Sequence, residues 1–190
     1  MKTISIICQK GGVGKTTTVV NIASVFSKLG YKTLIIDLDP QGNVSTYLNY
    51  DKMSENHTDS IDLLEKKESI QPGQISENLD ILSSNTEIAK FNEEKIVGGS
   101  KLQQAFRHIK FKEYQIILID TPPTMSSLVQ EALAVSDYYW IPAQPEFLAV
   151  EGVAQAMEFA KKTISTIQNS NPIFLGVLLN QIDRRRSSYL

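Results

Sequence analysis

The stretch Lys10-Gly-Gly-Val-Gly14-Lys15-Thr16-Thr17 decides the fold of this chain, because two different periodicities meet on either side of it. Residues 3–8 form a short apolar run rich in β-branched side chains, which predicts a strand. Residues 15–29 carry apolar side chains at helical spacing until Gly30 ends the pattern. The predicted local order is therefore strand, glycine-rich loop and helix.

The composition of this loop predicts phosphate binding. Its glycines allow backbone N–H groups to converge on one anion, and the start of the following helix adds partial positive charge. Lys15 is placed to reach terminal phosphates, and Thr16 offers a hydroxyl to Mg²⁺. The loop therefore predicts a nucleoside triphosphate site formed by Gly11, Gly12, Val13, Gly14, Lys15, Thr16 and Thr17.

The rest of the chain alternates strand-like and helix-like segments. Near-continuous apolar runs at 33–37 and 114–120 are typical of parallel strands that are covered on both faces. Further strands are expected at 79–82, 138–141 and 173–179, a turn at 71–73, and helices at 60–66, 100–109, 126–135 and 147–167. This order predicts an α/β fold with a mostly parallel central sheet flanked by helices. A length of 190 residues indicates one domain, 1–190.

Three aspartates stand at predicted strand ends. Asp37 and Asp39 follow one strand, and Asp120 ends another. Phosphoryl transfer requires a metal ion to neutralise charge and a group to orient the attacking water, and these carboxylates can share the two tasks. The alternative for each is a turn or helix-cap residue, a role that aspartate often takes.

Charge and cysteine content limit the possible partners. Lys plus Arg number 19 against 21 Asp plus Glu, a net charge of −2, so the molecule as a whole has no basic field that attracts nucleic acid. Arg184-Arg185-Arg186 forms the one dense basic cluster, which is either a local DNA contact or a solvated charge run. One cysteine, Cys8, fits a reducing cytosol. With no signal peptide and no apolar stretch long enough to span a bilayer, we expect a cytoplasmic protein without a membrane partner.

The loop departs from the usual phosphate-loop pattern, and this difference is itself typical of a known family. Gln9 stands where a glycine is usual, and Lys10 follows it, five residues before Lys15. In this the sequence resembles the deviant Walker A family, and within it the ParA-type partition ATPases. The resemblance extends through Asp37-Leu-Asp39-Pro-Gln-Gly-Asn43, Asp120-Thr-Pro-Pro123 and Gly176-Val-Leu-Leu-Asn180. It covers nearly the whole chain, with 51–75 matching least.

The resemblance implies a P-loop ATPase that uses ATP and Mg²⁺ and works slowly without a partner. Lys10 matches the lysine that contacts ATP phosphates across a dimer interface, and with Lys15 and Asp39 it completes the implied catalytic set. Asp39 matches the residue that orients or activates the attacking water. Thr16, Asp39 and Asp120 form the implied metal site, in which Asp120 holds Mg²⁺ largely through water. Asn180 matches a position that in many relatives contacts adenine.

The resemblance also implies partners and a process. These are an ATP-bound homodimer, non-specific DNA bound through Arg184, Arg185 and Arg186, a ParB-like centromere-binding protein, and a nucleoid-associated role in plasmid or chromosome segregation. Two alternatives remain: a MinD-like membrane-associated regulator of cell division, and a metabolic ATP-dependent synthetase with the same loop. Relatives usually continue past the position of Leu190 with a helix, a strand and a terminal helix, so we expect the chain to lack these elements.

Overall fold

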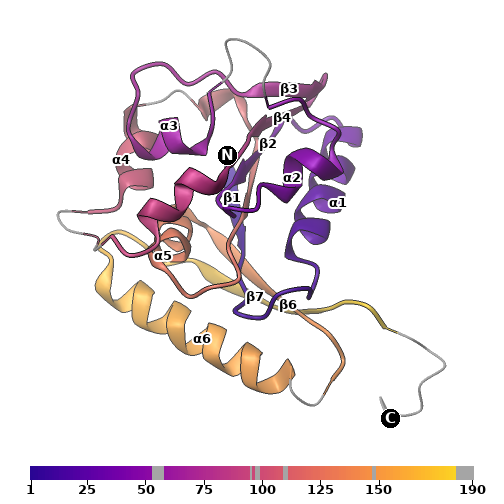
Figure 1. Ribbon diagram of the computed structural model, residues 1–190, viewed down its shortest axis with the longest axis vertical. Helices are drawn as coiled ribbons and strands as arrows, with labels where there is room; N and C mark the ends of the chain where they lie inside the picture. The colour runs from indigo at the N-terminus through magenta and orange to yellow at the C-terminus, as the bar shows by residue number, and fades with distance from the viewer. Residues whose placement is uncertain (53–57, 95, 97–98, 109–110, 147–148, 183–190) are drawn as a thin grey trace.

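A seven-stranded sheet forms the centre of the computed structural model, which describes residues 1–52, 58–94, 96, 99–108, 111–146 and 149–182 (Figure 1). The strand order is β3-β4-β2-β5-β1-β6-β7. β3 is antiparallel to β4, and the other neighbouring strands are parallel. The prediction of a mostly parallel sheet is therefore confirmed. The strands are β1 (Lys2–Ile6), β2 (Thr33–Asp37), β3 (Gly73–Ser76), β4 (Leu79–Leu82), β5 (Ile116–Asp120), β6 (Tyr138–Ala143) and β7 (Ile173–Leu179).

Helices cover both faces of the sheet. α1 and α2 lie on one side, and α3, α4, α5 and α6 lie on the other (Figure 1). Within the described residues, no helix has the length and apolar character needed to cross a membrane. The helices are α1 (Lys15–Lys28), α2 (Asn43–Tyr47), α3 (Ser60–Leu64), α4 (Lys101–His108), α5 (Ser127–Val135) and α6 (Ala149–Thr166), with short 3₁₀ turns η1 (Thr86–Phe91) and η2 (Phe111–Glu113).

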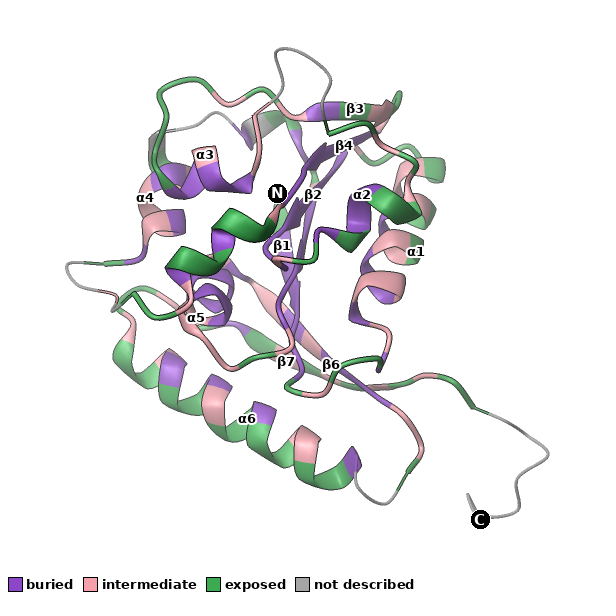
Figure 2. Cartoon of the chain, viewed as in Figure 1, coloured by how far each residue is buried: buried purple, intermediate pink, exposed green. Residues whose placement is uncertain are grey.

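The central strands are buried because successive side chains enter different cores. In β2, Leu34 and Ile36 pack with α3, α4 and α5, whereas Ile35 packs with α1 and α2. All three side chains are fully buried, and Figure 2 shows the same burial along the middle of the sheet. A strand covered on both faces has no polar side, which explains the continuous apolar run in the sequence.

β6 is longer than the sequence predicts. The strand was expected to end at Ile141, but it continues through Pro142 to Ala143. The carbonyl of Trp140 accepts from the N–H of Ile7, so the backbone nitrogen two residues later faces the same side, beyond the end of β1. At Pro142 there is no β1 residue to accept from a backbone N–H, so the missing N–H of proline costs no hydrogen bond. On the other edge of β6, Pro142 is paired with Leu178 of β7.

Besides the 3₁₀ turn η1, the weakly patterned region between residues 41 and 99 contains a helix and a strand that the sequence did not predict. α2 follows the Asp39 turn, and β3 begins at Gly73, where a turn was expected. Gly73 lies directly against the ring of Tyr50, so a Cβ there would collide with the phenol. Each element has four or five residues, too few for a periodicity to be recognised in a sequence.

Candidate active site

The glycine-rich loop joins β1 to α1 with a backbone that only glycine adopts easily. Gly12 has φ 74° and Gly14 has φ 92°, both in the left-handed region. Gly14 precedes the first helical residue, Lys15, and no side chain caps this helix. The N–H groups of the first turn of α1 are therefore left for an anion, as phosphate binding at a helix start requires.

Lys15 is buried at the base of this loop. The residue is 6% exposed, and its Nζ donates to the carbonyl of Lys10 at 3.4 Å. Burial lowers the pKa of Lys15, while the charges of Asp120 and Asp39 oppose this change. A bound polyanion would compensate the buried ammonium further, so the position suits terminal phosphates.

A hydroxyl and a carboxylate meet beside the loop. Thr16 Oγ1 donates to Asp120 Oδ2 at 2.6 Å. The other oxygen, Asp120 Oδ1, is buried and has no hydrogen-bond partner among the described residues. Burial raises the pKa of Asp120 to about 7, although the Thr16 hydrogen bond and the charge of Lys15 lower it. An unpartnered buried carboxylate oxygen next to a hydroxyl fits a divalent cation that prefers oxygen ligands.

Mg²⁺ fits this donor set better than a metal that needs several strong side-chain ligands. In the described part of the chain, no group of three or more His, Cys, Asp or Glu side chains is placed to hold a metal ion. Mg²⁺ is usually bound by one or two carboxylates together with substrate phosphates and water. The Thr16 and Asp120 pair can supply the protein share of such a site.

Asp37 and Asp39 differ in their contacts, which the sequence left open. Asp37 is fully buried, and its carboxylate accepts from the N–H of Asp39 at 2.9 Å and of Val44 at 3.4 Å. Burial, followed by the charge of Asp120, raises its pKa well above the usual range. Asp39 Oδ1 accepts from the N–H of Gln41 at 2.9 Å, which closes a tight turn. Asp37 therefore holds the turn, and Asp39 belongs to it.

Three strand ends bring these aspartates together. Asp37 and Asp120 are direct partners in the β2–β5 ladder, and Ile6, just before the loop, is also in register with Asp120. Loop and carboxylates thus meet at the carboxyl edge of a parallel sheet, where α/β proteins bind their ligands.

Lys10 lies at the outer rim of the loop. Its Nζ is 3.1 Å from Glu146 Oε2 and 3.5 Å from Gln144 Oε1, both on the segment between β6 and α6. The side chains of Lys10 and Glu146 are 38% and 49% exposed, so this ion pair is solvated. In the single chain, the Lys10 side chain therefore points to its own β6–α6 segment.

Side chains just beyond the ends of β6 and β7 donate hydrogen bonds to the loop, and the sequence did not predict this contact for two of them. Gln144 Nε2 and Gln181 Nε2 donate to the carbonyl of Gly12 at 3.2 and 2.9 Å. Asn180 Nδ2 donates to the carbonyl of Val13 at 3.1 Å. The available signal was position, because all three follow directly on the carboxyl ends of β6 and β7.

Comparison with known proteins identifies the family. A family model described as an AAA domain matches residues 1–173. The sporulation initiation inhibitor protein Soj of Bacillus subtilis is 34% identical over 196 residues, covering 97% of this chain and 74% of Soj. The chromosome partitioning protein ParA of Caulobacter vibrioides (strain NA1000 / CB15N) is 32% identical over 197 residues, covering 98% of this chain and 72% of that protein. The chain belongs to the ParA family of partition ATPases.

Solved structures of ParA-like proteins share the fold. A putative plasmid partition protein of Borrelia burgdorferi, bound to AMPPNP, matches with a TM-score of 0.84 at 28% identity, over 99% of this chain and 78% of that one. Cobyrinic acid a,c-diamide synthase of Mycobacterium smegmatis, with ADP and magnesium, matches with a TM-score of 0.86 at 26% identity, over 100% and 78%. The ParA-like fold thus carries adenine nucleotides in its solved relatives.

The remaining predicted residues of this ParA-family chain divide into two groups. Gly11 and Thr17 belong to the loop and the first turn of α1, as the sequence predicts. Arg184, Arg185 and Arg186 lie outside the described residues, so their contribution to DNA binding stays a prediction.

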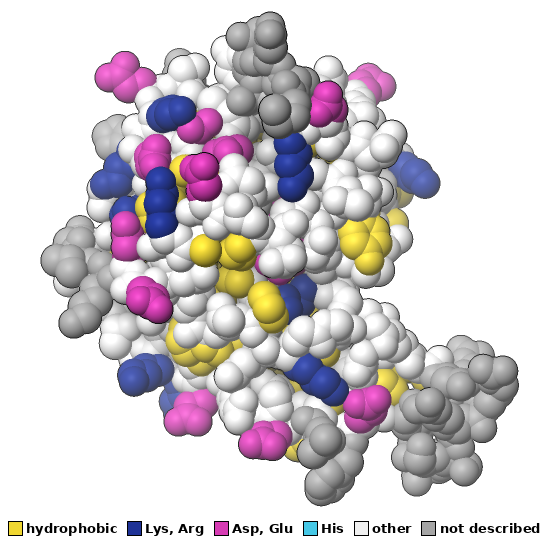
Figure 3. Space-filling view, in the orientation of Figure 1, with side chains coloured by type: hydrophobic (Ala, Val, Ile, Leu, Met, Phe, Trp, Pro, Cys, Tyr) yellow, Lys and Arg dark blue, Asp and Glu magenta, His cyan; other side chains and the backbone are white. Residues whose placement is uncertain are grey.

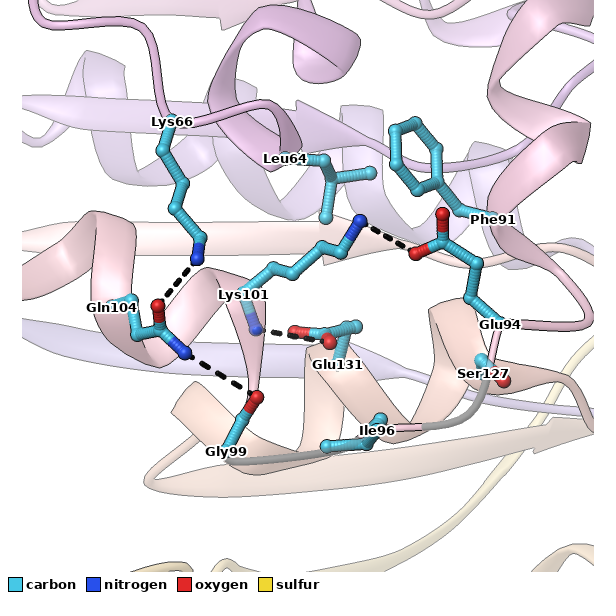
Figure 4. Close-up of a pocket in the computed structure, with 10 residues that line it drawn as sticks. All are labelled: Leu64, Lys66, Phe91, Glu94, Ile96, Gly99, Lys101, Gln104, Ser127 and Glu131. Atoms are coloured by element: carbon cyan, nitrogen blue, oxygen red, sulfur yellow. Dashed lines mark hydrogen bonds and ion pairs between the residues drawn. The ribbon is translucent and has the colours of Figure 1, made fainter.

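Two hollows on the face of the sheet that α3, α4, α5 and α6 cover are separate from the phosphate loop. One, of about 90 Å³, lies among α3, α4 and α5, and the other, of about 780 Å³, extends along α4 to the end of α6. Figure 4 shows that polar groups of the smaller hollow pair with one another. Glu131 accepts from the N–H groups of Lys101 at 3.0 Å and Leu102 at 2.9 Å, and so caps α4. Neither hollow is lined by a residue of the phosphate loop, 10–17, so this loop remains the candidate site.

Replacing Gly14 with alanine is expected to lower nucleotide affinity at least about tenfold and stability by about 1–3 kcal/mol. An added Cβ would collide with the Asn180 amide, whose Cγ is 3.3 Å away, at a φ of 92°. Nucleotide titration and thermal unfolding measure both effects.

Two alanine controls separate the causes of that loss. Gly30→Ala has a similar φ of 86° with nothing within 4 Å of the added Cβ, so it tests backbone strain alone. Gly152→Ala, inside α6 with open space, is expected to be neutral or slightly stabilising. Wild-type affinity in the Gly14→Ala protein would contradict the assigned loop geometry.

Proposed function

We propose that this chain is a Mg-ATP-dependent ATPase that dimerises around its nucleotides and acts in plasmid or chromosome partitioning. The proposal is carried by one observation: buried Lys15 and the hydrogen-bonded pair Thr16–Asp120 lie together at the glycine-rich loop, in which Gly12 and Gly14 have left-handed backbone angles. The ATP-bound dimer binds DNA non-specifically, and hydrolysis stimulated by a ParB-like partner resets it. Such a protein works in the cytoplasm in association with the nucleoid.

The residues divide the work of phosphoryl transfer among them. Lys15 binds the terminal phosphates at the start of α1, and Thr16 and Asp120 would hold Mg²⁺. Bound Mg²⁺ neutralises charge on the transferred phosphoryl group. Asp39 orients the attacking water, and its turn is held in place by the carboxylate of Asp37.

Lys10 is available for a second subunit because its present contacts are weak. A solvent-exposed ion pair such as Lys10–Glu146 contributes only about 0–1 kcal/mol. A triphosphate presented by a partner chain offers more negative charge and more acceptor oxygens. We therefore assign Lys10 to the partner's ATP, so that nucleotide links the two chains.

DNA binding is assigned to Arg184, Arg185 and Arg186. On the face shown in Figure 3, basic and acidic side chains of the described residues are interspersed, in keeping with a net charge of −2. A local cluster duplicated by dimerisation would give the ATP form up to six arginines for phosphate neutralisation.

ATP-dependent DNA retention measured against salt tests this function. Replacing the three arginines with alanine is expected to reduce retention and to lower the slope of log affinity on log salt by up to about 5, at about 0.9 for each phosphate contact. The control, Lys161→Ala with Lys162→Ala, removes two exposed charges from α6 and should retain DNA normally. Equal retention with and without ATP would overturn the proposal.

A metabolic synthetase is the second candidate, favoured by the likeness to the Mycobacterium smegmatis synthase. Such an enzyme would consume ATP in proportion to a small carboxylate or amine substrate and would not need DNA or a second protein. ATP hydrolysis stimulated by DNA together with a partition partner, without added small substrate, favours the partition function.

A further inference from the structure

Lys52 ties the turn that carries Asp39 to the neighbouring strand. Its Nζ donates to the carbonyl of Gly42 at 2.9 Å and to the carbonyl of Ser84 at 2.9 Å. Gly42 ends the turn, and Ser84 follows β4 and is 1% exposed. Ser84 lies two residues beyond the end of β4, whose pairing with β2 ends at Leu82, so its buried backbone is close to the sheet. One ammonium group therefore joins the carbonyl of the last residue of the turn to the carbonyl of a buried residue after β4.

The turn is built so that its position decides where the Asp39 carboxylate lies. The N–H of Gly42 donates to the carbonyl of Asp39 at 2.9 Å, and the N–H of Gln41 donates to Asp39 Oδ1 at 2.9 Å. The carboxylate is thus part of the turn's own hydrogen bonding. Any shift of the turn as a unit shifts this side chain with it.

Gly42 shows how closely the turn and Lys52 approach each other. Its φ of 58° lies in the left-handed region, and it caps the start of α2. A Cβ at this position would collide with Lys52 Nζ and would stand 2.5 Å from the carbonyl oxygen of Ser84. The glycine therefore leaves the space through which the lysine reaches both carbonyls.

Asp37 and Lys52 hold the turn from opposite ends. Asp37 binds the N–H of Asp39 at the first residue of the turn and the N–H of Val44 beyond it. Lys52 binds the carbonyl of Gly42 at the last residue. Asp37 belongs to the motif Asp37–Asn43 that the sequence analysis singled out. Lys52 lies outside both this motif and the phosphate loop.

We propose that Lys52 is a positioning residue for hydrolysis, which fixes Asp39 by bridging the carbonyls of Gly42 and Ser84. This inference rests on the proposed ATPase function and adds a residue to its machinery. Lys52 does not touch the loop that receives the phosphates, so it acts on the chemical step and not on nucleotide binding. Its effect passes through the backbone of the turn.

The test compares Lys52→Met with the wild-type protein. We expect kcat to fall about 10- to 100-fold, since a misplacement of about 1 Å at a reacting centre can cost about 100-fold. The Kd for Mg-ATP should stay within about twofold of the wild-type value, because the variant leaves the contacts that bind ATP in the ground state unchanged. Lys52→Arg should restore most of kcat, since a guanidinium also donates to carbonyls. The control Lys90→Met removes an exposed pair with Glu65 that involves neither Gly42 nor Ser84, and it should leave both constants unchanged.

Two further proteins separate failure of this inference from failure of the proposed function. If Asp39→Ala hydrolyses ATP at the wild-type rate, the role given to Asp39 is wrong. If Asp39→Ala is inactive but Lys52→Met has wild-type kcat, or loses affinity and kcat together, the positioning role of Lys52 is wrong. Adding Lys52→Met to Asp39→Ala should cause no further loss, because the lysine acts through that carboxylate.

Discussion

Lys10→Ala is expected to bind Mg-ATP but to remain monomeric and to lose at least about 1000-fold in hydrolysis, the scale of a cation supplied in trans to phosphoryl transfer. Binding persists because Lys15 and the start of α1, not Lys10, lie at the base of the loop. Dimerisation fails because the exposed Lys10 is the group we assign to the partner's phosphates. Light scattering with and without Mg-ATP measures the change in mass.

A variant of Glu146, the ion-pair partner of Lys10 within the same chain, provides the control. Glu146→Gln removes the negative charge that holds Lys10 in the single chain, at 3.1 Å, but keeps the lysine. It should dimerise with ATP at least as well as the wild-type protein. A full ATP-dependent dimer of Lys10→Ala would remove this lysine from the interface, and a monomeric Glu146→Gln would show that Glu146 itself is needed there.

The fold was predictable where local pattern and tertiary burial agree. The runs that become β2 and β5 are apolar throughout because both faces of each strand are covered, and the glycine-rich loop between β1 and α1 carries its own backbone requirement. β7 shows the limit of this reasoning. Its sequence is equally apolar, yet Ile173 and Leu179 are 59% and 57% exposed in the described chain. An apolar run predicts a strand, but it does not reveal the strand's neighbours.

The candidate site was predictable as a set of residues but not as a set of contacts. Asp37 and Asp39 could not be told apart in the sequence, because their roles depend on which backbone N–H groups each accepts. The link from Lys52 to Ser84 spans 32 residues and the contact of Gln181 with Gly12 spans 169, so neither leaves a local pattern. Loop motifs report local backbone requirements, whereas these supporting contacts arise only from the sheet topology.

Asp120→Asn is expected to raise the thermal stability of the nucleotide-free protein at pH 8 while lowering Mg²⁺-dependent hydrolysis about 1000-fold. Burial raises the pKa of this carboxyl from 3.8 to about 7, so the folded state holds a proton that the unfolded state releases. Stability is therefore lost as pH rises from about 4 to about 7, by roughly 4 kcal/mol at 1.36 kcal/mol for each pKa unit. Asparagine carries no charge and escapes this cost, which predicts a gain of roughly 10 °C at pH 8.

The pH dependence distinguishes this cause from a general packing effect. At pH 5 the carboxyl is still largely protonated in the folded state, so the advantage of Asp120→Asn should shrink to less than about half of its value at pH 8. Mg²⁺ should raise the melting temperature of the wild-type protein more than that of the variant, because Thr16 and Asp120 form its proposed site, in which Asp120 acts directly or through water. Glu158→Gln, an exposed carboxyl on α6, serves as the control and should show neither effect. A variant less stable than the wild-type protein at pH 8 would mean that the buried carboxylate is already compensated without metal.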